Sequence, residues 1–161
     1  MNQLNPSRTP NGDRPAGGYT VLVVDDEEAV RHLAVRGLTR TGHQAIEARH
    51  GREALEAIEQ HGGPVHLVLT DIRMPGLTGP ELGRIVEQRW PSKRILYMST
   101  FASEVFRTGL LRPDAPLLAK PFTREDLARK VRSLVEGIIS RDGLPTAAAA
   151  PRDGGLTATG A

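Results

Sequence analysis

Short apolar runs alternate along this chain with stretches in which apolar residues recur at helical spacing. The first run, Tyr19–Val24, has the composition of a strand that is buried on both faces. Similar runs follow, bounded by turn residues such as glycine and proline, and they predict four more strands at Gln44–Ala48, Leu67–Thr70, Ile95–Met98 and Leu117–Ala119. Strands that alternate with helical patterns indicate an α/β fold built from βα units around a parallel sheet.

The segments between these strands predict amphipathic helices. The helix after the first strand is predicted to bury one side, made of Val30, Leu33, Ala34, Gly37 and Leu38. Two further helices are predicted at about Arg52–Gln60 and Pro80–Arg89. A short helix is predicted within Ala102–Leu111, and its length is limited by the prolines that follow.

The last helix is predicted to begin after Thr123. The hydroxyl of Thr123 can cap this helix, and Asp126 three residues later completes a pair similar to a capping box. Apolar residues then repeat at helical spacing, which predicts a packing face made of Leu127, Val131, Leu134, Val135 and Ile138.

The two ends of the chain differ from this pattern. Residues 1–18 are rich in Pro, Gly, Asn and Arg, and residues 141–161 are of low complexity, so both are predicted to be flexible tails. A single domain is therefore predicted over residues 19–140, which suits a chain of 161 residues. The segment after Ser140 is too short for a DNA-binding or enzymatic domain, so we expect no output domain.

Composition narrows the classes of function. The chain has no cysteine, which excludes disulfides, thiol nucleophiles and zinc–thiolate sites. Its formal net charge is +2 and its basic residues are scattered, which argues against nucleic-acid binding. It has no signal peptide and no apolar run of membrane-spanning length, so we expect a cytoplasmic protein that does not bind membranes.

Polar side chains suited to chemistry follow four of the five predicted strands. Asp25 and Asp26 follow the first strand, Asp71 the third, Ser99 the fourth and Lys120 the fifth. The carboxyl ends of parallel strands share one edge of the sheet, where open α/β folds bind their ligands. Three carboxylates at one edge repel each other unless a cation neutralises them, and their hard oxygen atoms suit Mg²⁺. The sequence therefore predicts a magnesium site beside a lysine and a serine.

Such a site has the parts that phosphoryl transfer needs, because this reaction depends on positioning and on neutralising the phosphoryl oxygens. Lys120 supplies a positive charge, Ser99 supplies a hydroxyl donor, and Asp71 is the natural nucleophile. A single aspartate at a strand end is more often a helix cap. Caps alone do not explain both the lysine and the acids at successive strands, so the combined pattern favours the functional interpretation.

Other classes that share an alternating βα pattern lack their signatures here. A dinucleotide-binding domain needs G-x-G-x-x-G after the first strand, where this chain has DDEE. The P-loop motif G-x-x-x-x-G-K-[ST] and the serine-hydrolase elbow G-x-S-x-G are both absent. An aspartate-based phosphatase needs a D-x-D pair, whereas Asp25 and Asp26 are adjacent.

Four segments, VLVVDDEE, LVLTDIRMPGLTG, ILYMST and LLAKPFTREDLARKV, resemble the receiver domains of bacterial two-component response regulators in content, order and spacing. The resemblance covers about residues 19–140 and is strongest to the receivers found at the C-termini of hybrid sensor histidine kinases. It implies a flavodoxin-like doubly wound fold, with a five-stranded parallel sheet in the order 2-1-3-4-5 and helices on both faces.

The resemblance also implies a role for each residue of the site. Asp71 would be the phosphoacceptor, and Mg²⁺ would be bound directly by Asp26, Asp71 and the backbone carbonyl of Arg73, with Asp25 acting through a metal-bound water. The hydroxyl of Ser99 would move toward the phosphoryl group, and Lys120 would precede a cis proline, Pro121.

Several positions depart from the family pattern. Leu117 stands where many members have a rotating Tyr or Phe, so gating by an aromatic side chain is not expected, and Thr100 stands where Ala or Gly is common. Two bulky residues flank the site, Arg73 two positions after Asp71 and Phe101 two positions after Ser99. We predict that they shield the acyl phosphate from water and slow its hydrolysis.

The function implied is a phosphorylation-dependent switch in a two-component system or phosphorelay. Asp71 would take a phosphoryl group from a histidine kinase or phosphotransfer protein, and the signal would leave through a downstream protein or by onward transfer, over the surface of the fourth helix, fifth strand and fifth helix. The protein would assist its own phosphorylation and dephosphorylation without being an enzyme. The alternative is a degenerate receiver that binds partners independently of phosphate. The five histidines have no metal-binding spacing and are expected to be exposed.

Overall fold

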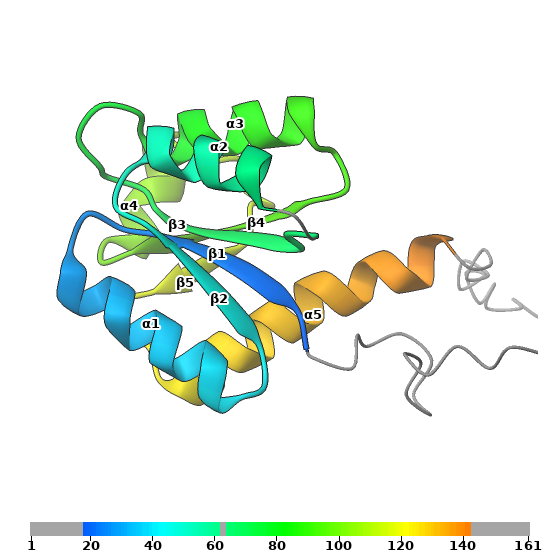
Figure 1. Ribbon diagram of the computed structural model, residues 1–161. Coiled ribbons are helices and arrows are strands. Elements are labelled where there is room, and N and C mark those ends of the chain that lie inside the picture. The colour runs from blue at the N-terminus through cyan, green and yellow to red at the C-terminus, as the bar shows by residue number, and fades with distance from the viewer. Residues whose placement is uncertain (1–17, 62–63, 143–161) are drawn as a thin grey trace, which may run out of the picture.

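The computed structural model describes residues 18–61 and 64–142, which are drawn in colour in Figure 1. This part of the chain contains one parallel sheet of five strands in the order β2-β1-β3-β4-β5, as predicted. Its strands are β1 (Thr20–Val24), β2 (Gln44–Ala48), β3 (Leu67–Asp71), β4 (Arg94–Ser99) and β5 (Leu117–Ala119).

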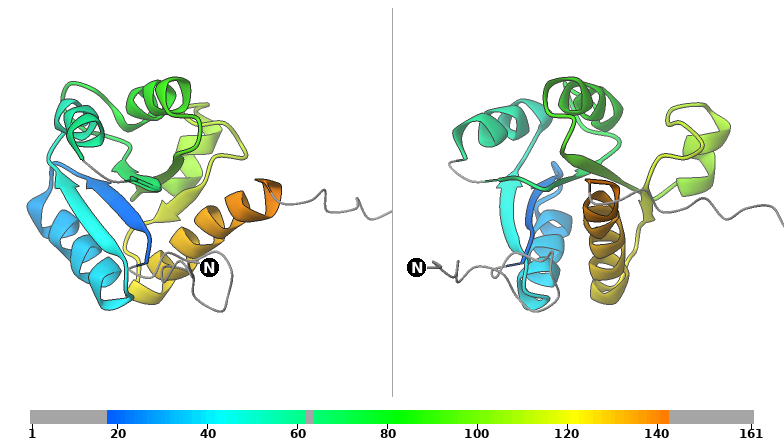
Figure 2. Two further views of the ribbon diagram at one scale, coloured as in Figure 1. Left: turned by 45° about the vertical axis from the view of Figure 1, so that its right-hand side comes forward. Right: turned by 90° about the vertical axis from the view of Figure 1, so that its right-hand side faces the viewer.

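Helices cover both faces of this sheet, which makes the fold doubly wound (Figure 2). They are α1 (Glu28–Arg40), α2 (Gly51–Gln60), α3 (Gly79–Arg89), α4 (Ala102–Arg107) and α5 (Arg124–Asp142). The pair α1 and α5 lies on one face, and α2, α3 and α4 lie on the other (Figures 1 and 2). No helix within the described ranges combines the length and the apolar character that a membrane span requires.

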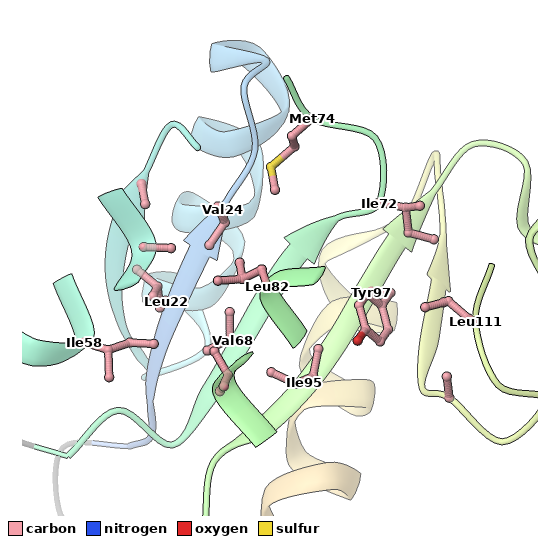
Figure 3. Close-up of a cluster of buried hydrophobic side chains, with 14 of the residues drawn as sticks. Leu22, Val24, Ile58, Val68, Ile72, Met74, Leu82, Ile95, Tyr97 and Leu111 are labelled. Atoms are coloured by element: carbon pink, nitrogen blue, oxygen red, sulfur yellow. The ribbon is translucent and has the colours of Figure 1, made fainter. Parts of the chain in front are cut away.

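Each face of the sheet carries its own hydrophobic core. On β1, Val21 and Val23 belong to the cluster under α1 and α5, whereas Leu22 and Val24 belong to the cluster under α2 and α3. This division follows from the alternation of side chains along a strand. Figure 3 shows the second cluster, in which Leu82 of α3 reaches the strands. Burial on both faces explains why the strand is apolar at successive positions.

The packing of α1 differs from the prediction. Leu33 was predicted to be buried, but 51% of its surface is exposed. The side facing the core instead contains Arg31, Ala34 and Leu38, at spacings of three and four residues, together with Gly37. The prediction was wrong because it followed hydrophobicity and so excluded an arginine, which is buried here with specific polar partners.

The predicted cap of α5 is present. The backbone N–H of Asp126 donates to Thr123 Oγ1 at 3.1 Å, and the N–H of Thr123 donates to Asp126 Oδ2 at 3.2 Å. The predicted packing face is buried at Leu127, Val131 and Val135. Helix α5 ends at Asp142, two residues beyond the predicted boundary of the domain. The remainder of both predicted tails and the side chain of Ile138 lie outside the residues described.

The expectation that the histidines are exposed is wrong for His43, which is 4% exposed. Its Nδ1 accepts a hydrogen bond from the N–H of Tyr19 at 3.2 Å. In the same way, Nδ1 of His66, which is partly buried, accepts one from the N–H of Thr20 at 2.9 Å. Both imidazole rings lie against the ring of Tyr19. These two histidines therefore anchor the start of β1.

Candidate functional site

The carboxyl ends of the strands bring Asp25, Asp71 and Lys120 into direct contact. Lys120 follows β5, and its Nζ donates to Asp71 Oδ1 at 2.7 Å and to Asp25 Oδ2 at 2.9 Å. The side chains of Asp25, Asp71 and Lys120 are only 1%, 14% and 14% exposed. The peptide bond between Lys120 and Pro121 is cis, as the resemblance implied. Three residues from three strand ends thus form one shielded ionic cluster.

Asp25 is the most deeply buried member of this cluster. Its Oδ1 accepts a hydrogen bond from the N–H of Glu27 at 2.9 Å, while Oδ2 accepts from Lys120. The N–H of Asp25 donates to the carbonyl of Ala48 at 3.2 Å. A buried charge is costly unless it is paired and hydrogen-bonded, and here both carboxylate oxygens have a donor.

Asp71 ends β3, where the strand order places it between β1 and β4. Its Oδ2 accepts a hydrogen bond from the N–H of Arg73 at 3.0 Å. Burial raises the pKa of the Asp71 carboxyl above its usual value, and the negative charge of Asp25 adds to this effect. The hydrogen bond and positive charge of Lys120 lower the pKa and offset only part of the increase.

Lys120 is shared by the two carboxylates. Burial alone lowers the pKa of its ammonium group, but the hydrogen bonds and charges of Asp71 and Asp25 outweigh that effect, so the net pKa is raised. The ammonium group therefore stays charged. One positive charge faces two negative charges, so the cluster keeps an excess of negative charge when both carboxylates are ionised.

Ser99 ends β4 beside this cluster and is 7% exposed. Its Oγ accepts a hydrogen bond from the N–H of Phe101 at 3.0 Å, and its carbonyl accepts one from the N–H of Lys120 at 2.8 Å. The first bond orients the serine hydroxyl toward the loop after β4. The second ties the backbone of Lys120 to the end of the neighbouring strand.

Arg73 and Phe101 lie on the loops that follow β3 and β4. The guanidinium carbon of Arg73 lies 5.6 Å from the centre of the Phe101 ring, which is within the range of a cation–π contact. Both side chains are exposed, Phe101 to 54%. The sequence identified each residue as a neighbour of the site, but the contact between them was not predicted.

The donor atoms at this edge fit a magnesium ion. Within the described ranges, no three His, Asp or Glu side chains are grouped as a complete set of protein ligands. Mg²⁺ does not need such a set, because it keeps several waters and is usually held by one or two carboxylates. Asp26 is exposed next to Asp25, and the carboxylates of Asp25 and Asp71 carry more negative charge than Lys120 neutralises. The hard oxygen atoms and this charge suit the ion.

One residue near the site was missed by the sequence analysis. Arg31 is 7% exposed, and its Nη1 donates to the backbone carbonyl of Asp25 at 2.8 Å. Its Nε donates to Glu47 Oε2 at 3.2 Å. The signal that could have identified it is its spacing, since Arg31 is three residues before Ala34 and seven before Leu38 on the same side of α1.

A family model places this architecture among known proteins. The model of the response regulator receiver domain matches residues 21–132, which is more than half of the 161 residues. The chain therefore belongs to the family of response regulator receiver domains of two-component systems.

Curated relatives agree with this assignment. The sensor kinase CckA of Brucella abortus is 39% identical over 123 residues, which cover 75% of this chain and 13% of CckA. The transcriptional regulatory protein YrkP of Bacillus subtilis is 32% identical, with 70% of this chain and 48% of YrkP covered. This chain thus spans less than half of either protein. The receiver protein CpdR of Brucella abortus is 29% identical, with 71% of this chain and 95% of CpdR covered.

Solved structures show the same fold. The chemotaxis response regulator CheY4 of Vibrio cholerae superposes with a TM-score of 0.62 at 27% identity, covering 71% of this chain and 97% of CheY4. The receiver domain of the hybrid histidine kinase CckA superposes with a TM-score of 0.59 at 30% identity, covering 71% of this chain and 96% of that domain. These similarities and the strand order confirm the predicted flavodoxin-like fold.

Proposed function

We propose that this protein is a phosphorylation-dependent switch in which Asp71 accepts a phosphoryl group from a histidine kinase or phosphotransfer protein. The observation that carries the proposal is the placement of Lys120, whose Nζ lies within hydrogen-bond distance of both Asp71 and Asp25. This triad lies at the carboxyl ends of the strands, where open parallel α/β sheets bind their ligands. Membership of the receiver family supports the same assignment.

The reaction moves one phosphoryl group between two nucleophiles. A carboxylate oxygen of Asp71 attacks the phosphorus of a phosphohistidine, a P–O bond forms, and the P–N bond breaks with its electron pair returning to the imidazole. Lys120 lies against Asp71 and neutralises negative charge on the phosphoryl oxygens. The N–H of Arg73 fixes the second carboxylate oxygen and so orients the nucleophile.

Magnesium belongs to this proposal as the cofactor. Asp26, Asp71 and the carbonyl of Arg73 would hold the ion, with Asp25 acting through a bound water. When bound, the ion supplies positive charge that neutralises the phosphoryl oxygens. The excess negative charge of the two carboxylates over Lys120 supports this assignment.

The signal would leave through protein contacts on the surface that contains α4, β5 and α5. Three large apolar side chains on and around α4 are exposed, Phe101 to 54%, Phe106 to 37% and Leu110 to 45%. Apolar side chains gathered on one surface mark sites of protein interaction more often than scattered ones do. Phosphorylation would act by shifting the populations of two states of this surface.

The alternative function is a degenerate receiver that binds its partners without phosphate. Amide NMR spectra separate the two proposals. When a small-molecule phosphodonor is added to protein that already contains saturating Mg²⁺, the switch predicts that amide signals change at Asp71, Ser99 and Lys120 and that the changes extend into α4. The degenerate module predicts that the spectrum is the same before and after the phosphodonor is added, both in wild type and in the control Asp71→Asn.

A further inference from the structure

Arg31 is a buried arginine with no role in the chemistry described so far. Only 7% of its surface is exposed, although arginine is almost never buried unless its charge is paired. It lies on the first turns of α1, directly after the loop that carries Asp25 and Asp26. Its position one helical turn from the acidic loop suggests that its partners matter to the site.

The guanidinium group joins three elements. Nη1 donates to the backbone carbonyl of Asp25 at 2.8 Å, and Nε donates to Glu47 Oε2 at 3.2 Å. Glu47 lies on β2, in register with Val23 of β1. Arg31 therefore connects helix α1, the loop after β1 and strand β2 at the edge where the site is formed.

These contacts fix the backbone that presents Asp26. The carbonyl of Asp25 and the nitrogen of Asp26 belong to one planar peptide group, so a bond to that carbonyl also orients Asp26. The loop is held on either side as well, because the N–H of Asp25 bonds to Ala48 and the N–H of Glu27 bonds to Asp25 Oδ1. Asp26 itself is exposed.

We propose that Arg31 is a positioning residue that orients the Asp25–Asp26 loop for binding a divalent cation. This proposal rests on the proposed function, which assigns Mg²⁺ to this site. Arg31 acts through the Asp25 carbonyl and does not touch the phosphoryl group. Partners behind a metal ligand commonly change metal affinity by about 10- to 100-fold, and we expect an effect at the lower end because this partner holds backbone rather than a ligand side chain.

Arg31 has two opposite effects on the affinity for Mg²⁺. Its positive charge repels Mg²⁺, so removing it would strengthen binding if electrostatics dominated. The carboxylate of Glu47 lies 3.2 Å from Arg31 Nε and largely neutralises that charge. We therefore expect positioning to dominate, and loss of Arg31 to weaken binding.

Titration of the unphosphorylated protein with MgCl₂, followed by amide NMR signals of the loop after β1, tests this proposal. Arg31→Met is expected to weaken Mg²⁺ affinity by about tenfold. Arg31→Lys keeps the charge but loses the planar fork, so it is also expected to weaken binding. Arg89→Met is the matched control and should leave the affinity unchanged. Arg89 is the last residue of α3, and its side chain pairs with Glu59.

The Mg²⁺ affinity of Arg31→Met decides the proposal. Unchanged or tighter Mg²⁺ binding in Arg31→Met would overturn the proposal, as would a lower Tm with no change in affinity, which is the result of a merely structural role. If Arg31→Met does not fold, Arg31→Lys carries the test, and it should weaken binding. The titration contains no phosphodonor, so its result does not depend on whether Asp71 accepts a phosphoryl group.

Discussion

The guanidinium of Arg73 stacks on the ring of Phe101, with 5.6 Å between the guanidinium carbon and the ring centre. The two residues belong to different loops, one following Asp71 and the other following Ser99. Their contact joins two bulky side chains from loops at the edge of the sheet that holds Asp71, the proposed phosphoacceptor. We predict that the two side chains together limit the access of water to an acyl phosphate on Asp71.

Breaking this contact is predicted to speed dephosphorylation. A cation–π contact at an exposed site contributes about 0.5–1 kcal/mol, which corresponds to about a two- to fivefold change in rate if the contact must open for water to enter. Arg73→Ala and Phe101→Ala should each increase the hydrolysis rate by about this factor. The double variant should add little to either single variant, because both remove the same contact.

The measurement is the decay of the phosphorylated protein after removal of the phosphodonor. Phe106→Ala is the control, since Phe106 is also an exposed phenylalanine but lies on α4. If Arg73→Ala and Phe101→Ala decay at the wild-type rate, shielding by these side chains is the wrong explanation.

Replacing Lys120 is predicted to impair phosphorylation strongly. Lys120→Met removes the ammonium group that pairs with Asp71 and leaves two carboxylates facing each other. Loss of one preorganised donor in an active site typically costs about 10²–10³ in rate, so we expect phosphorylation to slow by at least about 10²-fold. The initial rate of mass gain with a small-molecule phosphodonor measures this.

Lys93→Met is the matched control for this prediction. Lys93 is also partly buried, and its Nζ donates to the carbonyl of Val65 at 3.0 Å. It lies just before β4, at the edge of the sheet opposite the carboxyl ends. A wild-type rate in Lys120→Met would show that its contact with Asp71 does not serve the reaction.

Gly83 is predicted to be required for packing against Tyr97. A Cβ atom at Gly83 would lie 1.9 Å from the hydroxyl of Tyr97, which is far inside van der Waals contact. Overpacking costs about 1–3 kcal/mol, whereas alanine improves helix propensity by up to about 1 kcal/mol. Gly83→Ala should therefore lower the free energy of unfolding by up to about 2 kcal/mol.

Denaturant unfolding of a double-mutant cycle checks this. In a Tyr97→Phe background, Gly83→Ala should cost less, because the clashing hydroxyl is gone. Gly137→Ala on α5 is the control, since a Cβ there meets nothing within 4 Å, and it should be neutral or stabilising. An equal cost of Gly83→Ala in both backgrounds would rule out the clash with the hydroxyl as its cause.

His66 is predicted to make the fold less stable in mild acid. Burial lowers the pKa of His66 below its usual 6.5, and its Nδ1 accepts a hydrogen bond that a protonated ring cannot accept. The unfolded chain therefore takes up a proton first as the pH falls. The contribution of His66 to stability is complete above about pH 6.5 and is lost as the pH falls through the folded pKa.

Thermal unfolding between pH 7.5 and 5 measures this effect. His66→Gln keeps an acceptor for the N–H of Thr20 without a titrating ring, so its Tm should fall less than that of wild type across this range. His61→Gln, which changes the residue at the end of α2, should retain the wild-type slope. Equal slopes in wild type and His66→Gln would contradict the prediction.

The strands of the sheet were predictable because the apolar runs carry a local signal, whereas their order followed from the resemblance to receiver domains. A strand that is buried on both faces, such as Thr20–Val24, is apolar at almost every position. It can therefore be recognised without knowing which strands lie beside it. The residues at the strand ends were also predictable as a group, since parallel strands bring their carboxyl ends to one edge. The structure places Asp25, Asp71 and Lys120 in contact there.

The features that were missed depend on partners far away in the sequence. Arg31 is buried because the Asp25 carbonyl and Glu47 satisfy its guanidinium group. Its spacing places it on the buried side of α1, but the sequence does not show that these two partners are within reach. His43 is buried for a similar reason, since it accepts a hydrogen bond from Tyr19, 24 residues earlier in the chain. Leu33 has an apolar side chain like that of a core residue, but the orientation of α1 against the sheet leaves it exposed.

The intact mass of the protein after incubation with a small-molecule phosphodonor tests the central claim most directly. Wild type and Asp71→Asn are compared with Mg²⁺ and with a chelator. We predict a gain of one phosphoryl group in wild type with Mg²⁺, and no gain in Asp71→Asn or in the chelator. No gain in folded wild-type protein under any condition, or an equal gain in Asp71→Asn, would contradict the assignment of Asp71 as the phosphoacceptor.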